Sequence, residues 1–212
     1  EHAVAHANRY RGFIQADIDI IDYNMGSRVQ VDAECLATTI VALESLNIPP
    51  FQMHINHIRI ARALIKEAGI AEKDIQKVLS FIDKLAKKPR EEIIHLIQEQ
   101  VGFIDEKSVS ILLNRFQFSG KIEAFETGAS WGKEATEAFD ELQHLFVVLK
   151  SLGVKDDQVL FDLSMVRGLD YYTGVVCETF FTGDFRKYGS IASGGRYDGL
   201  IDTFEGKKTG LQ

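Results

Sequence analysis

The chain has 212 residues, 45% of them hydrophobic and 26% charged, a balance typical of a folded globular protein and not of a disordered one. No apolar run approaches the roughly 20 residues that a membrane-spanning helix needs. The net charge of -7 argues against nonspecific nucleic-acid binding, and two distant cysteines, Cys35 and Cys177, argue against a disulfide framework or a zinc site.

The first predicted element is a strand over residues 13–21, in which apolar and polar side chains alternate. Successive side chains of a strand point to opposite faces, so Gln15, Asp17 and Asp19 would share one face and could line a pocket together. Amide and carboxylate groups there suit a ligand that carries an ammonium group and ring N–H donors. Alternation alone is also typical of a strand whose polar face meets water, which is the commoner arrangement.

A helix and a second strand follow. Asp32 is the predicted cap of a helix that runs to about Leu46 and carries apolar residues at helical spacing. The pair Pro49 and Pro50 ends this helix, because proline cannot continue the helical hydrogen bonds. Residues 51–56 alternate again and predict a strand.

Residues 57–153 predict consecutive helices with short breaks. Pro89 suits the first turn of one helix, Gly102 lies past its end, and Asp105 is the candidate cap of the next. The simplest interpretation of the basic clusters on these helices is a solvent-exposed face. The clusters are Arg59, Arg62 and Lys66, and Lys84, Lys87, Lys88 and Arg90.

Residues 158–212 return to strand character, with predicted strands at 159–163 and 175–181. Strands therefore lie on both sides of a helical insertion. This order predicts an α+β domain with a mainly antiparallel sheet.

The loop between these strands reads Arg167-Gly-Leu-Asp-Tyr-Tyr-Thr-Gly174, a dense string of recognition groups. Arginine binds a carboxylate or a phosphate through a planar fork, and glycine lets the backbone approach a ligand closely. The alternative is a hairpin corner with packed tyrosines and an exposed arginine. An ordinary turn does not require this combination of arginine, tyrosines and glycines, so the sequence favours a ligand-binding site.

Two further stretches are ambiguous by themselves. The run Gly194-Gly-Arg-Tyr-Asp-Gly199 suits either a ligand site or a tight turn, and its spacing is not that of a dinucleotide fingerprint. Arg9, before the first strand, could meet nucleotide phosphates or be an ordinary exposed residue. His54 and His57 have no partner set for a metal and are interpreted as structural.

Three stretches resemble blocks of the histidyl-tRNA synthetases and occur in the same order. They are RYRGFIQADIDII at residues 9–21, RGLDYYTG at 167–174 and GGRYDGL at 194–200. The resemblance implies a class II synthetase fold, with an antiparallel sheet flanked by helices and an all-helical insertion domain. It divides the chain into a partial catalytic core, residues 1–60 and 154–212, and a helical insertion, residues 61–153.

The resemblance also implies an activity. Members of this family activate histidine with ATP to give histidyl-adenylate and pyrophosphate, and then transfer the histidyl group to tRNA(His). The helical insertion is expected to meet the acceptor arm of the tRNA. The expected enzyme is an aminoacyl-tRNA ligase, a cytoplasmic homodimer that uses Mg²⁺ and has no membrane association.

The histidine pocket of the family maps onto five residues of this chain. Gln15 corresponds to the glutamine near the α-amino group, and Asp19 to the acidic residue that reads the imidazole. The tyrosines Tyr171 and Tyr172 correspond to a pair that lines the pocket, and Tyr197 falls near it. Gln15 and Asp19 already share a predicted strand face, so a common pocket now becomes the preferred interpretation of that face.

Two arginines map onto the phosphate side of the site. Arg167 corresponds to the arginine that contacts the substrate carboxylate and the α-phosphate, so it is the predicted catalytic residue. It would stabilise charge that develops at phosphorus. Arg9 corresponds to a loop arginine that reaches the ATP phosphates. The resemblance assigns no metal ligand to this chain.

The resemblance begins inside the second class II motif and stops before the third, so we expect this stretch to be inactive alone. The main alternative is the synthetase-like regulatory subunit of ATP phosphoribosyltransferase, which shares the fold and senses histidine. Another is a synthetase-like module that senses tRNA. The intact Gln15, Asp19 and 167–174 block favour the enzyme.

Overall fold

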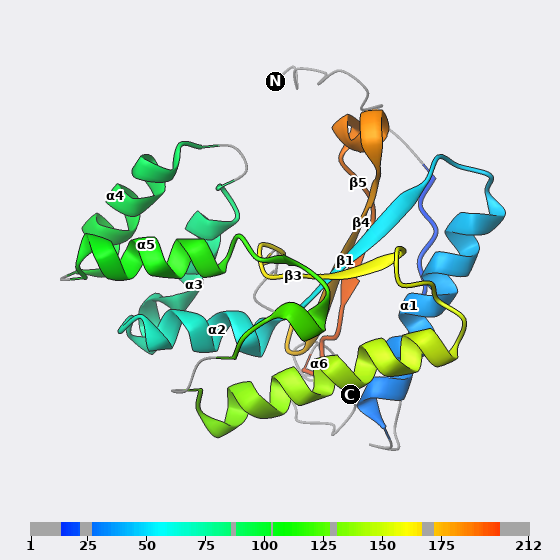
Figure 1. Cartoon of the computed structure of the whole chain (residues 1–212), viewed down its shortest axis with the longest axis horizontal. Helices are drawn as coiled ribbons and strands as arrows, with labels where there is room; N and C mark the ends of the chain where they lie inside the picture. The colour runs from blue at the N-terminus through cyan, green and yellow to red at the C-terminus, as the bar shows by residue number, and fades with distance from the viewer. Residues whose placement is uncertain are drawn as a thin grey trace.

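The computed structural model describes residues 14–21, 27–85, 88–102, 104–127, 131–166 and 172–199. Its centre is a five-stranded sheet with strand order β2-β3-β1-β4-β5 (Figure 1). Helices cover one side of the sheet, and a separate group of helices extends away from it. The fold class is therefore α+β, as the sequence predicts.

The sheet is mixed but mainly antiparallel. The central strand β1 (Phe51–His57) is parallel to β3 (Val159–Asp162) and antiparallel to β4 (Val175–Phe181). The outer strands β5 (Ser190–Gly195) and β2 (Ser119–Gly120) add antiparallel ladders to β4 and β3. The predicted strands at 51–56, 159–163 and 175–181 are confirmed to within a residue.

Two long helices cover one face of this sheet. Helix α1 (Arg28–Ser45) packs along α6 (Lys133–Ser151), and α6 also contacts β1. Their buried residues recur every three or four positions, which keeps one apolar stripe of each helix against the core. In α6 these include Ala138, Leu142, Leu145 and Leu149.

Four helices between β1 and β2 form a second group, on the left of Figure 1. They are α2 (Ile58–Glu67), α3 (Glu72–Ile82), α4 (Arg90–Val101) and α5 (Glu106–Arg115). Each packs on its neighbour in sequence. Helices are confirmed over most of residues 57–153, but the described residues between α5 and α6 include the short strand β2 and no α-helix. The division of the chain into two domains remains a prediction.

The ends of these helices follow local chemistry. Gly102 ends α4 in a left-handed conformation with φ of 86°, which glycine adopts without strain. Asp105 caps α5 by accepting a hydrogen bond from the Ser108 amide at 2.9 Å. Pro89 lies one residue before α4 and not in its first turn. No helix within the described ranges is long and apolar enough to cross a membrane.

An aromatic cluster joins β3 to α6 and to the segment that precedes α6. The ring of Phe161, fully buried, lies at centroid distances of 5.3 to 6.3 Å from Phe118, Phe125 and Phe139. Trp131 packs on the same cluster, close to the start of α6. Short 3-10 helices, η1 (Ile122–Ala124) and η2 (Gly183–Tyr188), complete the described elements.

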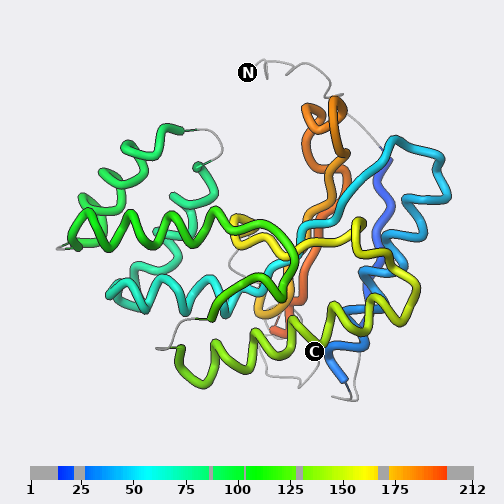
Figure 2. Tube along the Cα trace, viewed as in Figure 1, coloured from blue at the N-terminus to red at the C-terminus, as the bar shows by residue number. Residues whose placement is uncertain are grey.

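Two local predictions are wrong. Helix α1 begins at Arg28, after Ser27, so Asp32 lies inside the helix and does not cap it. Residues 14–21 form no strand, and Figure 2 traces them as an irregular run. A strand is held by a backbone ladder, and no strand of the described sheet pairs with this segment. Its isoleucines are accordingly exposed, Ile14 completely.

Candidate functional site

Two predicted pocket residues from opposite ends of the chain meet in the structure. Tyr197 follows β5, and its hydroxyl donates a hydrogen bond to the Asp19 carboxylate across 178 positions of sequence. The phenol and the carboxylate together offer a donor and acceptors to a polar ring. The structure therefore brings the 9–21 and 194–200 blocks into one place.

Tyr172 lies against the glycine pair of the same block. A Cβ atom at Gly195 would be 2.8 Å from Cδ1 of Tyr172 and 2.8 Å from the Val175 carbonyl oxygen. Only glycine leaves room for this contact between the ring and the backbone. The glycine therefore allows a close approach between two parts of the chain, and the Tyr172 ring lies against Gly195, two residues before Tyr197 in the sequence.

Hydrogen bonds fasten the start of β4 to the segment that follows β5. The Thr173 amide donates to the Arg196 carbonyl at 2.8 Å, and the Arg196 amide donates to the Val175 carbonyl at 2.8 Å. The Thr173 hydroxyl donates to Asp198 at 2.8 Å. The described residues 172–175 and the segment 194–198 are therefore one structural unit.

Gln15 is exposed, and its amide donates to the Asp17 carboxylate at 2.6 Å. Asp17, not the Asp19–Tyr197 pair, is thus the partner that the structure gives it. The other predicted site residues, Arg9, Arg167 and Tyr171, lie outside the described residues.

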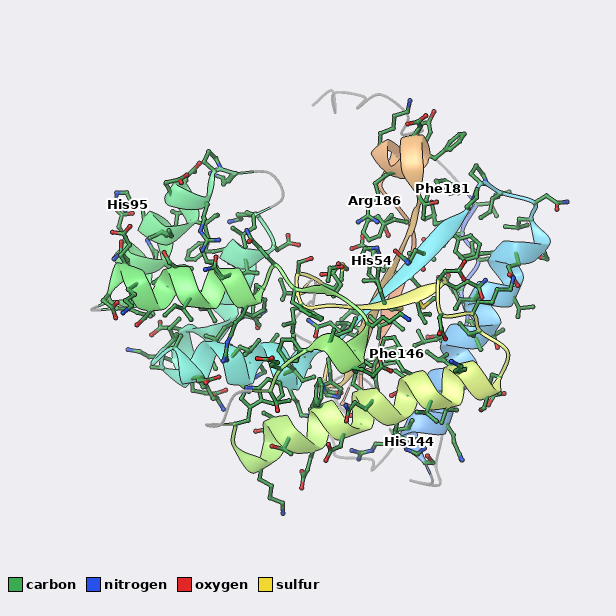
Figure 3. The ribbon with its side chains drawn as sticks, in the orientation of Figure 1. His54, His95, His144, Phe146, Phe181 and Arg186 are labelled. Atoms are coloured by element: carbon green, nitrogen blue, oxygen red, sulfur yellow. The ribbon has the colours of Figure 1, made fainter. Side chains whose placement is uncertain are left out.

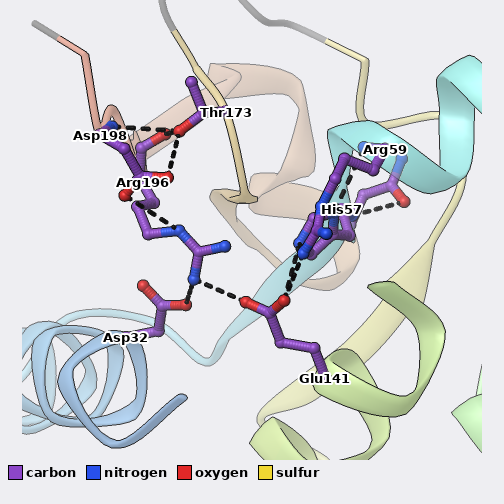
Figure 4. Close-up of polar contacts among 8 residues, drawn as sticks. Asp32, His57, Arg59, Glu141, Thr173, Arg196 and Asp198 are labelled. Atoms are coloured by element: carbon purple, nitrogen blue, oxygen red, sulfur yellow. Dashed lines mark hydrogen bonds and ion pairs between the residues drawn. The ribbon is translucent and has the colours of Figure 1, made fainter. Parts of the chain in front are cut away.

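Beside this unit lies a buried ion-pair cluster that the sequence analysis missed (Figure 4). Nη1 of Arg196 is 2.6 Å from Asp32 on α1 and 2.6 Å from Glu141 on α6. All three side chains are at most 15% exposed, so the arginine is anchored on both helices that cover the sheet. Asp198 adds a weaker pair, 3.5 Å from Nε.

Glu141 has a second set of partners at the junction of β1 and α2. Its other carboxylate oxygen accepts a hydrogen bond from Arg59 and lies 3.7 Å from Nε2 of His57. The Arg59 amide donates to Nδ1 of His57 at 3.2 Å, which leaves the ring proton on the Nε2 side that faces Glu141. One carboxylate therefore bridges the segment after β5 and the first turn of α2.

The pKa values of the two carboxylates that contact Arg196, those of Asp32 and Glu141, are shifted in opposite directions. Burial raises the pKa of Asp32 to about 6, although Arg196 acts to lower it. Burial acts to raise the pKa of Glu141 too, but its interactions with His57 and Arg196 outweigh burial and lower the pKa to about 2. Burial lowers the pKa of His57. At neutral pH, Glu141 is charged and His57 is neutral.

The opposite face of the sheet carries a second buried polar group (Figure 3). Nδ1 of His54 is 2.6 Å from Asp162, and Nη1 of Arg186 lies 3.0 Å from its Nε2. The Arg186 guanidinium also lies 4.1 Å from the Phe180 ring centroid. These contacts give His54 a packing role. Among the described residues, no group of three or more histidine, cysteine or acidic side chains is suited to a metal ion.

Two solved structures show which class of protein has this arrangement. The histidyl-tRNA synthetase of Nostoc sp. PCC 7120 superposes with a TM-score of 0.76 at 27% identity, covering 85% of this chain and 43% of that one. An ATP phosphoribosyltransferase regulatory subunit/histidyl-tRNA synthetase of Bacillus halodurans gives 0.67 at 25% identity, covering 85% and 46%. The fold is that of a class II synthetase core.

The sequence comparisons specify the family. The model of the histidyl-tRNA synthetase family matches residues 3–210, and the chain belongs to this family. It is 37% identical to the cytoplasmic histidine–tRNA ligase of Dictyostelium discoideum, over 98% of this chain and 43% of that protein. With the enzyme of Treponema denticola the identity is 34%, over 92% and 43%. The chain spans less than half the length of these curated relatives.

Proposed function

We propose that this chain is the central part of a histidine–tRNA ligase. In the complete enzyme the histidine carboxylate would attack the α-phosphorus of ATP to give histidyl-adenylate and pyrophosphate, and the histidyl group would then pass to tRNA(His) with release of AMP. The observation that carries the proposal is the hydrogen bond between Tyr197 and Asp19. This bond joins residues of two blocks that the family uses for its amino-acid pocket, and it supports a role for the Asp19 carboxylate in recognising an imidazole N–H.

The other residue roles belong to the same proposal. Gln15 and the Tyr171–Tyr172 pair contribute to histidine binding, and Arg167 contacts the histidine carboxylate and the α-phosphate of ATP as the catalytic residue. Arg9 binds the ATP phosphates. Their support is the match of residues 3–210 to the family.

The same family match supports the proposed substrates, cellular location and oligomeric state of the complete protein. They are histidine, ATP with Mg²⁺ and tRNA(His), handled by a cytoplasmic homodimer. Mg²⁺ neutralises phosphate charge in reactions of this kind. The described residues contain no cluster that fits it, so the proposal gives them no role in holding the metal.

The test is pyrophosphate exchange by the full-length protein, offered each of the twenty amino acids in turn. Exchange should depend on histidine alone, and Arg167→Ala should abolish it because charge at phosphorus loses its partner. A full-length protein that exchanges with another amino acid, or an active Arg167→Ala variant, would contradict the assignment.

The similarity to the Bacillus halodurans protein keeps a second candidate, the regulatory subunit of an ATP phosphoribosyltransferase. A regulatory subunit of this kind would bind histidine without forming an adenylate. Histidine binding by calorimetry in the absence of histidine-dependent exchange would support this candidate over the ligase.

A further inference from the structure

The arginine of the 194–200 block and the tyrosine that follows it have different partners. Tyr197 reaches Asp19, whereas the preceding side chain, Arg196, reaches Asp32 and Glu141 among the helices that cover the sheet. The two side chains share a backbone that is bonded on both sides, to Thr173 and to Val175. The position of Tyr197 is therefore tied to the position of the Arg196 guanidinium.

The guanidinium itself has little freedom. It is 11% exposed, it is always charged, and a buried charge without a partner is strongly disfavoured. A Cβ atom at Gly174 would overlap the guanidinium, so the backbone at the start of β4 closes the space around it. Two carboxylates from different helices contact the same nitrogen, Nη1, and so fix the position of that end of the guanidinium.

Glu141 connects this anchor to the base of the helices α2 to α5. It contacts Arg196 with one oxygen, and Arg59 with the other, in the first turn of α2. The Arg59 side chain is 23% exposed and that of Glu141 is 15% exposed, so solvent screens the bridge only partly. A displacement of the first turn of α2 would therefore be transmitted to Tyr197 through the Glu141 carboxylate and the Arg196 guanidinium.

We propose that Arg196 and Glu141 are positioning residues for histidine recognition, which hold Tyr197 against Asp19 and link this pair to the base of the helical stretch α2–α5. The proposal rests on the proposed function, because it takes Asp19 and Tyr197 as walls of the histidine pocket. Neither Arg196 nor Glu141 touches the substrate. Their contribution is to binding geometry, and it is specific to the amino acid and not to ATP.

The experiment compares histidine binding by calorimetry with pyrophosphate exchange, using the full-length protein. Glu141→Gln removes the charge that Arg196 and Arg59 share, and Arg196→Lys replaces the fork by a single point charge. Each variant should weaken histidine binding about ten- to hundredfold, since small misplacements of binding groups have effects of this size. The KM for ATP should stay within about twofold of the wild type.

The matched controls are Glu67→Gln and Arg115→Lys. These residues form another arginine–glutamate pair at 2.6 Å, between α2 and α5 and away from the β5 segment. They should leave the Kd for histidine unchanged. Equal losses in the control pair and the proposed pair would mean that the effect is general destabilisation, and would overturn the proposal.

A double-mutant cycle separates positioning through Tyr197 from any other cause. In the Tyr197→Phe background, the further effect of Glu141→Gln or Arg196→Lys on the Kd for histidine should nearly vanish, because the hydroxyl they position is gone. Fully additive effects would overturn the proposal. If Glu141→Gln does not fold, Arg196→Lys and Glu141→Asp carry the same cycle with the charges kept.

If the proposed function is wrong, the wild-type protein itself will give a different result in these assays. A wild type that binds histidine without exchange would contradict the ligase assignment, and the cycle on Kd would still decide the positioning roles. A wild type that binds no histidine would overturn both proposals.

Discussion

Asp32 holds a carboxylate in surroundings that disfavour its charge. Burial raises its pKa from the ordinary 3.8 to about 6, so between these values the folded state binds a proton that the unfolded state has released. Wild-type stability should therefore fall, relative to Asp32→Asn, as pH rises from 4 to 6. Each unit of pKa difference corresponds to about 1.4 kcal/mol. Urea unfolding of both proteins at each pH measures the difference, and parallel stability profiles would contradict the expectation.

Gly174 gives a second test at the scale of single residues. A methyl group there would overlap the Arg196 guanidinium, which two carboxylates hold in place. Gly174→Ala should cost about 1–3 kcal/mol through overpacking. Gly132→Ala is the control, because open space surrounds that glycine and its φ is -68°. Thermal unfolding compares the two variants, and equal melting temperatures would show that the guanidinium moves aside without cost.

Sequence patterns predicted the positions of helices and strands better than they predicted the contacts of single side chains. The β1 and β4 strands were predictable from alternation and β-branched residues, and the Asp105 cap from its place before an apolar helix. Asp32 was assigned to a cap because aspartate favours that position. Its actual partner, Arg196, is 164 residues away, and no local pattern encodes such a contact.

The Asp105 cap of α5 carries a prediction at the scale of elements. Asp105 accepts hydrogen bonds from the amide and the hydroxyl of Ser108, and Asp105→Ala leaves the first turn without that acceptor. The melting temperature should fall by about 2–4 °C. Asp140→Ala, at an exposed position within α6, should change it little. A cap variant that melts with the wild type would contradict the role.

For the molecule as a whole, the aromatic cluster around Phe161 joins the sheet to α6. Phe161 is fully buried against three other phenylalanines, so Phe161→Ala should cost about 3–5 kcal/mol. Phe185→Ala removes a ring that is 46% exposed and should cost far less. Chemical denaturation gives both values. Similar costs would indicate that the cluster is not central to stability.

At this scale the sequence predicted an α+β fold with a helical insertion, but not the strand order. The parallel pairing of β1 with β3 depends on how the chain returns after five helices, which alternation and propensity do not describe. For the predicted pocket, the family resemblance identified Asp19 and Tyr197, and the structure brings these two residues together. Glu141 was missed because it is one acidic residue among several on an amphipathic helix.

The position of β1 in the sheet has a consequence for synthesis on the ribosome. Both neighbours of this central strand are encoded about 100 residues later, as the contact between Gln52 and Asp157 across 105 positions illustrates. At about 5–20 residues per second, β1 waits roughly 5–20 s before a partner strand is translated. The helices α2 to α5 pack through local contacts and can form during this interval. The middle of the sheet is thus completed only after the helices that lie between its strands in the sequence.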